Sequence, residues 1–355
     1  MKTGAVNLAG TGQSQDKAAA REKPAVRSIA DLARIAGVSV STVSRALTGK
    51  GTLNDKTRER VRALAEEHDF RLNVAAQNLR LGRTGAIGVL LPLGHERGQQ
   101  LSEPFFSAML GHLADELAAR GFDLLLSRVL PGRDCWLDDF VRSGRTDGVI
   151  VIGQSDQSAV LDEVAGHYRN MVVWGAHDPA QAYVTVGSDN VAGGALAARH
   201  LLGRGRRKLA FFGHHPAPEF VAREQGFLAA LPEDLRDAVQ SVPAHLTPEE
   251  SYAAASAYFE AGNRPDGVFA ASDIIAMSVL AAAAEHGVSV PADLSVIGFD
   301  DILLARIATP PLTTVRQDIA EGARLLVDLL QRRMAGEEDV ASVQLEPALI
   351  ERESS

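Results

Sequence analysis

The chain has 355 residues, of which 46% are hydrophobic and 23% charged; this length exceeds what one hydrophobic core usually supports, so we expect two or three domains. No apolar run reaches the roughly 20 residues that cross a bilayer, and residues 1–27 lack the apolar stretch of a secretory signal, so we expect a cytoplasmic protein. Cys135 is the single cysteine, which excludes an internal disulfide and a cysteine-rich zinc site.

The formal net charge of −9 is unevenly distributed along the chain. Residues 1–83 hold 15 Lys and Arg against 8 Asp and Glu, a net charge of +7, which leaves 21 against 37, a net charge of −16, for residues 84–355. A basic segment on an acidic body confines the surface that attracts phosphate to one part of the chain. This distribution favours a modular DNA-binding protein.

Residues 1–27 show no apolar periodicity, and we interpret them as a flexible basic tail. The pattern changes at Ser28, a candidate N-cap, after which apolar residues recur at helical spacing for two turns. Gly37 ends this helix, and Ser39 is the candidate N-cap of a second short helix over residues 40–47. Two short helices joined by a tight turn are typical of a helix-turn-helix.

A third helix is expected over residues 55–68, and residues 73–84 are interpreted as a hinge helix and linker. The helical stretch within the linker, residues 74–80, is too short to be stable alone. We therefore expect it to be helical only when a partner stabilises it.

Beyond the linker, short apolar β-type runs alternate with Ala- and Leu-rich helical runs. The predicted strands lie at residues 86–91, 124–127, 148–152, 171–174, 208–212, 267–271 and 295–299. Short buried strands separated by helices indicate parallel, doubly wound sheets. Two such sheets, linked more than once, would form a cleft between two lobes.

The second predicted helix carries residue types that can read DNA. In a helix-turn-helix this helix enters the major groove with its first turn against base edges and phosphates. Val40 can contact a thymine methyl group, and Arg45 is long enough to reach a guanine edge. The short hydroxyl donors of this segment are Ser39, Ser41, Thr42 and Ser44. An ordinary helical hairpin with solvated hydroxyls is the alternative interpretation.

Three runs of residues in the head form a specific pattern: Ile29-Ala30-Asp31-Leu32-Ala33, Gly37-Val38-Ser39 and Ser41-Thr42-Val43-Ser44-Arg45-Ala46-Leu47. In these residues the head resembles that of the lactose-repressor family of regulators. Further motifs similar to that family follow at Lys56-Thr57-Arg58-Glu59-Arg60-Val61, Asn73 to Arg80, Asp147-Gly148-Val149-Ile150, Arg223-Glu224-Gln225-Gly226-Phe227 and Val296-Ile297-Gly298-Phe299-Asp300-Asp301. Only residues 1–27 fall outside it.

The resemblance implies an all-α helix-turn-helix domain over residues 28–72 and an α/β effector-binding and dimerisation core over residues 85–355. The core is expected to contain two doubly wound parallel-sheet lobes, similar to type I periplasmic binding proteins. We expect the first lobe at about residues 85–186 and 317–337, and the second at about residues 187–316 and 338–355.

The resemblance also implies how DNA is bound. The hinge residues Asn73, Leu79 and Arg80 would pair with those of a second subunit in the minor groove, where Leu79 would wedge between central base pairs. Leu79 could instead be an ordinary core leucine on a helix face. Ser28 completes the candidate DNA contacts. Because each subunit of a homodimer would read one half-site, the operator should be pseudo-palindromic.

Candidate effector contacts lie at predicted strand ends of both lobes. Arg223, expected at the start of a helix, and Asp300 provide a donor fork and an acceptor pair that suit sugar hydroxyls, and these positions touch the effector in the family. Ser272 and Asp273 follow another predicted strand and are further candidates. Alternatively, Arg223 and Asp300 form a structural ion pair, and Asp273, like Asp189, caps a helix.

Three aromatic residues, Phe105, Phe106 and Trp174, are expected to face the cleft, where a ring can stack on a sugar or a base. Core packing is the alternative for each of them. Trp174 attracts most interest because it precedes a glycine at a predicted strand end.

Four positions depart from patterns in the family. Leu246 replaces a stacking aromatic and Ser272 replaces an amide found in some members. Ala217 and Glu219 lack the cationic contacts expected of purine-sensing relatives. The departures at Leu246 and Ser272 leave the identity of the effector open, whereas those at Ala217 and Glu219 favour an uncharged saccharide or glycoside.

These features predict a transcriptional repressor whose operator affinity is controlled by a small molecule, either as inducer or as corepressor. The sequence shows no P-loop, zinc-protease, nucleophile-elbow or dinucleotide-binding motif, and His214 and His215 lack the further ligands of a metal site. We expect no enzyme activity, cofactor or metal. A transport receptor would share the core fold but has no use for residues 28–83. The chain also lacks a leucine-repeat tail, which favours a dimer over a tetramer.

Overall fold

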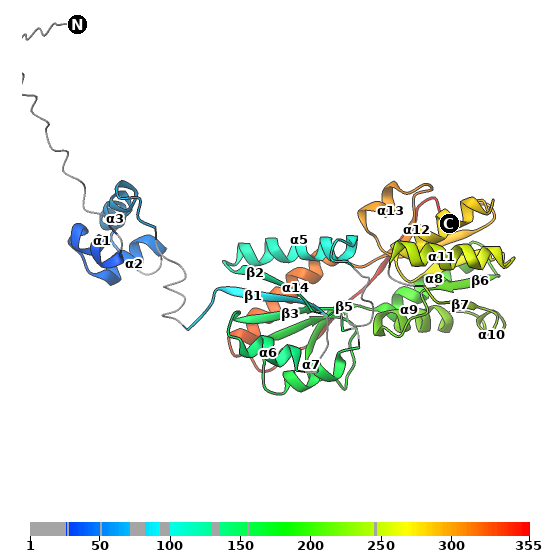
Figure 1. Cartoon of the computed structure of the whole chain (residues 1–355), viewed down its shortest axis with the longest axis horizontal. Coiled ribbons are helices and arrows are strands. Elements are labelled where there is room, and N and C mark those ends of the chain that lie inside the picture. Colours follow the sequence, from blue (N-terminus) through cyan, green and yellow to red (C-terminus); the bar gives the residue numbers. More distant parts are fainter. Residues whose placement is uncertain are drawn as a thin grey trace, which may run out of the picture. The chain divides into compact units, whose positions relative to one another are not determined.

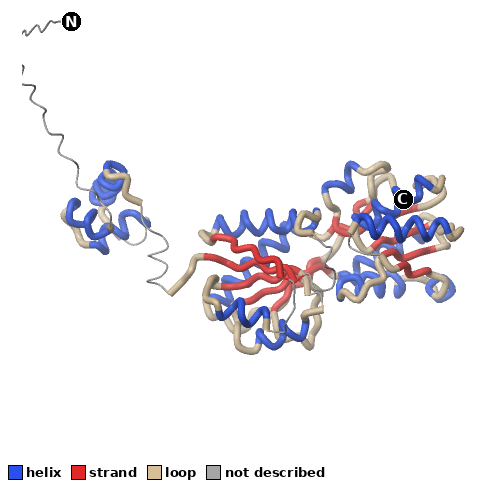
Figure 2. Tube along the Cα trace, viewed as in Figure 1, coloured by secondary structure: helices blue, strands red, loops and turns tan. Residues whose placement is uncertain are grey.

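The computed structural model describes residues 26, 28–49, 52–71, 82–92, 100–129, 135–154, 156–244 and 247–355. The chain divides into two compact units, residues 1–81 and residues 82–355. The described part of the first unit is helical, whereas the second unit contains two six-stranded sheets with helices packed around them (Figures 1 and 2). In the described part of the chain, none of the helices has the length and apolar character to span a membrane.

The first unit contains the helices α1 (Ile29–Ala36), α2 (Val40–Thr48) and α3 (Asp55–Glu67). Each begins after an N-cap whose side chain accepts a hydrogen bond from a backbone N–H of the first turn: Ser28, Ser39 and Asn54. Gly37 ends α1 with a φ of 63°, which glycine adopts without a steric penalty. The two predicted caps at Ser28 and Ser39 and the predicted break at Gly37 are confirmed.

A small core holds the three helices together. Arg60 Nη2 of α3 donates to the carbonyl oxygen of Ala36 at 2.8 Å, and Arg62 Nε donates to that of Ala46 at 3.3 Å. These bonds satisfy carbonyl groups near the carboxyl ends of α1 and α2. The fully buried side chains of this core are Leu32, Val43, Ala46 and Val61. Helix α3 therefore fixes α1 and α2 relative to each other.

The first sheet of the second unit has the strand order β11-β5-β4-β3-β1-β2, with every neighbouring pair parallel. Its strands are β1 (Ala86–Pro92), β2 (Asp123–Val129), β3 (Gly148–Ile152), β4 (Met171–Trp174), β5 (Val184–Ser188) and β11 (Val343–Leu345). One face packs against α5 (Pro104–Ala119) and α14 (Ile319–Met334), the other against α6 (Trp136–Arg142) and α7 (Ser158–Ala165). Because both faces are covered, β3, β4 and β5 are buried throughout.

The second sheet has the order β12-β10-β9-β8-β6-β7, in which only β12 is antiparallel to its neighbour. Its strands are β6 (Leu209–Phe212), β7 (Gln240–Val242), β8 (Gly267–Ala270), β9 (Ser295–Asp300), β10 (Thr313–Arg316) and β12 (Ala348–Ile350). Its helices are α8 (Asn190–Gly203), α9 (Pro218–Ala229), α10 (Glu233–Arg236), α11 (Pro248–Glu260), α12 (Asp273–Glu285) and α13 (Leu303–Ile307).

The predicted fold class, a helical head with two parallel-sheet lobes, is confirmed, but one lobe assignment is wrong. The sequence placed residues 338–355 in the second lobe, whereas β11 joins β5 in the first sheet and only β12 belongs to the second. A three-residue strand leaves no apolar run to detect. The chain therefore passes between the lobes three times: after β5, after β10 and between β11 and β12. The other predicted domain boundaries remain predictions.

Helices α8 and α9 pack backbone against backbone. A Cβ on Gly194 of α8 would overlap the carbonyl oxygen of Arg223, and a Cβ on Gly226 of α9 would overlap that of Val191. Only glycine allows this approach. The contact fixes the position of Arg223 on α9.

Replacing Gly226 with alanine should therefore destabilise the second lobe. We expect Gly226→Ala to lower the free energy of unfolding by about 1–3 kcal/mol, because the backbones of α8 and α9 must move apart. Gly203→Ala is the matched control, since a Cβ on this α8 residue meets nothing within 4 Å. Thermal unfolding of both variants measures the difference, and equal melting temperatures would contradict this view of the packing.

Candidate functional site

Helix α2 exposes the face that was predicted to read DNA. Ser39, Val40, Ser41 and Arg45 are exposed, whereas Val43 is completely buried against the core of the unit. Helix α2 is held by its buried side while its first turn and Arg45 remain accessible.

The hydroxyl groups of this turn bond to one another. Ser39 Oγ lies 2.8 Å from both Ser41 Oγ and Thr42 Oγ1. Ser44 is half-buried. The side chain of Arg45 makes no hydrogen bond or ion pair with any other residue that the structure describes. Its guanidinium is thus available to a partner. Ser28 differs, because its hydroxyl donates to Asp31 Oδ2 at 2.8 Å while capping α1.

Three predicted DNA contacts, Asn73, Leu79 and Arg80, lie outside the described residues, as does Leu246.

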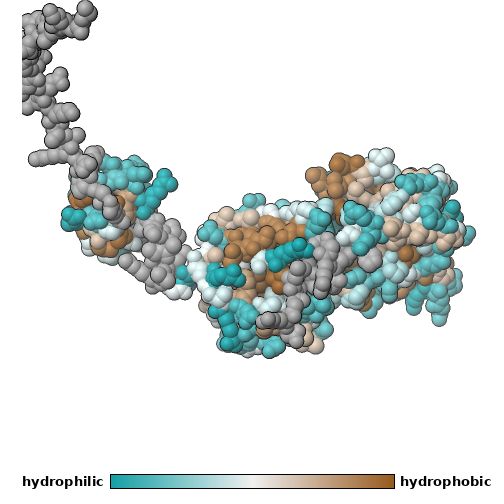
Figure 3. Space-filling model, viewed as in Figure 1, coloured by the Kyte–Doolittle hydropathy of each residue, from teal (hydrophilic) through white to brown (hydrophobic). Residues whose placement is uncertain are grey.

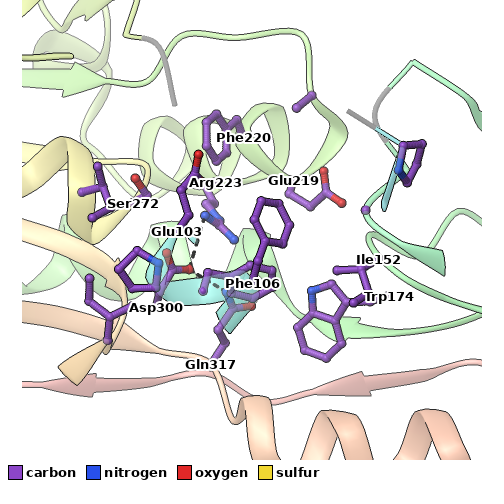
Figure 4. Close-up of a pocket in the computed structure, with 17 residues that line it drawn as sticks. Glu103, Phe106, Ile152, Trp174, Glu219, Phe220, Arg223, Ser272, Asp300 and Gln317 are labelled. Carbon is purple, nitrogen blue, oxygen red and sulfur yellow. Dashed lines mark hydrogen bonds and ion pairs between the residues drawn. The ribbon is translucent and has the colours of Figure 1, made fainter. Parts of the chain in front are cut away.

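A cleft lies between the two lobes of the second unit, where strand ends of both sheets meet (Figure 4). Its polar lining comes mainly from the second lobe, with Asp300 at the end of β9 and Arg223 on α9. Parallel sheets commonly bind ligands at this edge. The predicted effector contacts that line the cleft are Phe105, Phe106, Trp174, Arg223, Ser272 and Asp300.

Arg223 is buried and held on several sides. It lies in the middle of α9 rather than at the start of a helix as expected, because Pro218 already opens the helix. Its Nε donates to Asn190 Oδ1 at 2.8 Å and its Nη1 to the carbonyl oxygen of Ala271 at 2.6 Å. The guanidinium carbon lies 3.7 Å from the centroid of the Phe299 ring. Arg223 therefore has a fixed orientation in the cleft wall.

Asp300 faces Arg223 without closing on it. Its Oδ1 lies 3.9 Å from Arg223 Nη1, longer than a charge-assisted hydrogen bond of about 2.7–2.9 Å. The same oxygen accepts from Gln317 Nε2 at 2.6 Å, and Gln317 Oε1 accepts from Ser188 Oγ at 3.0 Å. Asp300 also has a φ of 116°, a strained conformation for a residue other than glycine. Arg223 and Asp300 thus form a loose ion pair that also lines the cleft. The two roles predicted for them, effector contact and structural ion pair, are therefore compatible.

The polar network around Arg223 and Asp300 includes two chain passages between the lobes. Ser188 ends β5, Asn190 begins α8, and Gln317 links β10 to α14. Sequence reasoning missed Asn190 and Gln317, because polar residues near helix starts usually only cap. Ser188 thus connects to Asp300 through Gln317, and Asn190 bonds directly to Arg223. Both chain passages are therefore linked to the Arg223–Asp300 pair.

Burial raises the pKa of Asp300 from 3.8 to about 6, against the opposing effects of the Arg223 charge and the Gln317 hydrogen bond. Burial likewise lowers the pKa of Arg223, while the Asp300 charge opposes this. The protonation of Asp300 is thus sensitive to what enters the cleft.

The assignment of Asp273 to the effector is wrong. Asp273 is fully buried outside the cleft, where it accepts hydrogen bonds from Thr314 Oγ1 at 2.5 Å and from the backbone N–H of Ile302 at 2.9 Å. It does not cap α12 either, because Ser272 occupies the N-cap. Asp273 instead joins α12 to the segments around β9 and β10. The predicted cap at Asp189 is confirmed by its bond from the backbone N–H of Ala192.

The aromatic residues form one wall of the cleft. The ring centroids of Phe105 and Phe106 are 5.5 Å apart, and those of Phe105 and Trp174 are 6.3 Å apart. Trp174 is 5% exposed, and a Cβ on Gly322 of α14 would overlap its ring. Trp174 thus packs in the core of the first lobe while part of it borders the cleft.

The raised pKa of Asp300 predicts a pH dependence of stability. The folded protein holds a proton between pH 3.8 and about 6 that the unfolded chain releases, so the free energy of unfolding should fall as pH rises through this range. Asp300→Asn should reduce this fall, whereas Asp237→Asn, at an exposed position, should not. Chemical denaturation at several pH values measures this fall. If the free energy of unfolding of Asp300→Asn changes with pH as steeply as that of the unaltered protein, the raised pKa of Asp300 is contradicted.

Comparison with known proteins identifies the two units. The family described as "Bacterial regulatory proteins, lacI family" matches residues 28–73, and "Periplasmic binding protein-like domain" matches residues 198–355. The HTH-type transcriptional regulator DegA of Bacillus subtilis is 32% identical, over 82% of this chain and 87% of that protein. The HTH-type transcriptional repressor PurR of Erwinia tasmaniensis is 32% identical, over 92% of this chain and 96% of that protein.

Solved structures share the fold of this chain. The transcriptional regulator CelR in complex with cellobiose is 28% identical, covers 92% of this chain and 99% of its own, and has a TM-score of 0.66. The Lac repressor dimer bound to operator and the anti-inducer ONPF has the same fold, with 23% identity, coverage of 92% and 98%, and a TM-score of 0.77. The chain belongs to the lacI family of bacterial regulatory proteins, and it is a DNA-binding transcriptional regulator with an effector-binding core rather than an enzyme.

Proposed function

We propose that this protein is a cytoplasmic homodimeric repressor whose affinity for a pseudo-palindromic operator is controlled by a saccharide or glycoside bound in the interlobe cleft. The observation that carries the proposal is the cleft itself, in which a fixed guanidinium and a carboxylate face each other beside an aromatic wall. Paired charged donors and acceptors beside aromatic rings suit sugar hydroxyls and sugar ring faces. The relative CelR was solved with cellobiose.

Base reading is assigned to the exposed first turn of α2 and to Arg45. Val40 would contact a thymine methyl group, and Arg45 a guanine edge in the major groove. The hydroxyls of Ser28, Ser39, Ser41, Thr42 and Ser44 would supply further contacts to DNA. The hinge residues Asn73, Leu79 and Arg80 would bind the minor groove, with Leu79 as the wedge.

A homodimer is supported by apolar surface on the second unit. Leu303 and Ile307 of α13 are 73% and 70% exposed, and Leu126 of β2 in the first lobe is also exposed. Hydrophobic atoms gather at the surface over α13 (Figure 3). Exposed apolar side chains in a group are typical of a surface that another protein covers.

Arg45→Ala should weaken specific operator binding by about 1–3 kcal/mol, because it removes the side chain assigned to a guanine edge. The operator is first selected from random duplexes with the full chain, and affinities for operator and unrelated DNA are then compared at fixed salt. Arg34→Ala, which removes the same charge from α1, should affect both DNAs equally. Unchanged operator affinity in Arg45→Ala would remove this residue from the interface.

A saccharide effector should stabilise the core against heat. A ligand present at about 100 times its dissociation constant adds about 2.7 kcal/mol to the free energy of unfolding. We would screen mono- and disaccharides, glycosides and nucleobases by thermal unfolding. Arg223→Lys should lose the response while retaining operator binding. A response to nucleobases alone would replace the saccharide proposal, and a response that survives in Arg223→Lys would exclude Arg223 as a contact.

A further inference from the structure

Glu219 is a carboxylate in the cleft that forms no ion pair with the residues that the structure describes. It lies in the first turn of α9 and is directed into the cleft, where Ile152 and Trp174 of the first lobe also lie (Figure 4). Within the described ranges, no Lys, Arg or His forms an ion pair with it. Burial raises the pKa of Glu219, opposed by its own backbone N–H, the Arg223 charge and the backbone N–H groups of Gln154 and Ala176.

Among the described residues that line the cleft, carboxylates outnumber cationic side chains. The carboxylates are Glu103, Glu219 and Asp300, and the single cationic side chain among the described lining residues is Arg223. Arg223 already faces Asp300 and bonds to Asn190 and Ala271. Glu103 accepts from the backbone N–H of Gln100. The Glu219 carboxylate is therefore partly withdrawn from water and forms no ion pair with a described residue, which disfavours its charged form until a ligand compensates the charge.

We propose that the effector is a saccharide bearing a protonated amino group, and that Glu219 binds this group. The inference rests on the proposed saccharide effector, and it replaces the uncharged saccharide that the sequence favoured with a positively charged one. An ammonium group donates up to three hydrogen bonds and cancels the carboxylate charge, whereas a hydroxyl group supplies only the hydrogen bond. Anionic ligands such as sugar phosphates would be repelled by the cleft.

The aromatic wall favours the same ligand chemistry. Phe105 and Trp174 lie with ring centroids 6.3 Å apart on the first-lobe side of the cleft. Ring faces attract cations and also stack on the apolar face of a sugar ring. One site therefore offers an aminated sugar ring aromatic faces for stacking, the Glu219 carboxylate for its charge, and the Arg223–Asp300 pair for its hydroxyl groups.

The test compares ligands that differ only at the amino position. Glucose, glucosamine and N-acetylglucosamine form one set; cellobiose, the β-linked disaccharide of glucosamine and that of N-acetylglucosamine form another. Binding to the full chain is measured by calorimetry at about pH 6.5, where an amine of ordinary pKa is protonated. We expect the aminated member of at least one set to bind roughly tenfold or more tightly than both neutral members.

Glu219→Gln keeps the shape and removes the charge, so the preference for the aminated sugar should shrink to less than about threefold in this variant. Glu224→Gln is the matched control, because Glu224 is on the same helix but bonds to His214 and Ser241 instead of lining the cleft. It should retain the preference.

Neutral sugars that bind as tightly as aminated ones would overturn this inference and leave the saccharide effector standing. A preference that persists in Glu219→Gln would also overturn it. Failure of every sugar to bind a chain that still binds its operator would overturn both the inference and the saccharide proposal.

Discussion

The close packing of α8 on α9 is the contact on which the cleft depends. Gly194 and Gly226 let the two helix backbones touch, and this places the guanidinium of Arg223 over the Phe299 ring. A buried guanidinium is tolerated only when its donors are bonded and its charge is opposed. Asn190 and the carbonyl oxygen of Ala271 meet the first requirement, and Asp300 at 3.9 Å meets the second. The long distance leaves the pair able to strengthen around a ligand.

The same network links the cleft to the connections between the lobes. Ser188 bonds to Gln317, which bonds to Asp300, so a side chain that ends β5 is tied to the cleft through the segment that follows β10. A ligand that changes the distance between Arg223 and Asp300 acts directly on these segments. Allosteric control requires that the ligand interacts differently with two arrangements of the lobes. We infer that the network provides it, and the predicted hinge at residues 73–84 would be the segment that responds.

Local patterns predicted much of the fold, because caps, breaks and apolar runs act over a few residues. Ser28, Ser39 and Gly37 were placed correctly, as were the cores of seven strands. Contacts between distant residues were harder to predict. The three-residue strand β11 has no pattern of its own, and Asp273 turns away from the cleft because Gly298 leaves space for its carboxylate. Of the cleft residues at strand ends, Trp174 and Asp300 were predicted, whereas Pro92 and Ile152 were not. The binding potential of Glu219 depends on its having no ion-pair partner among the described residues, which only the assembled site reveals.

One small molecule in the cleft and operator DNA on the head should influence each other through the protein. Thermodynamic linkage requires the coupling to be reciprocal. The most direct measurement is therefore the affinity of the full chain for the stabilising sugar, with and without saturating operator, beside the operator affinity with and without that sugar. We expect the same fold-change in both directions, about 5-fold to 150-fold. Operator and sugar affinities that do not depend on each other would contradict this coupling.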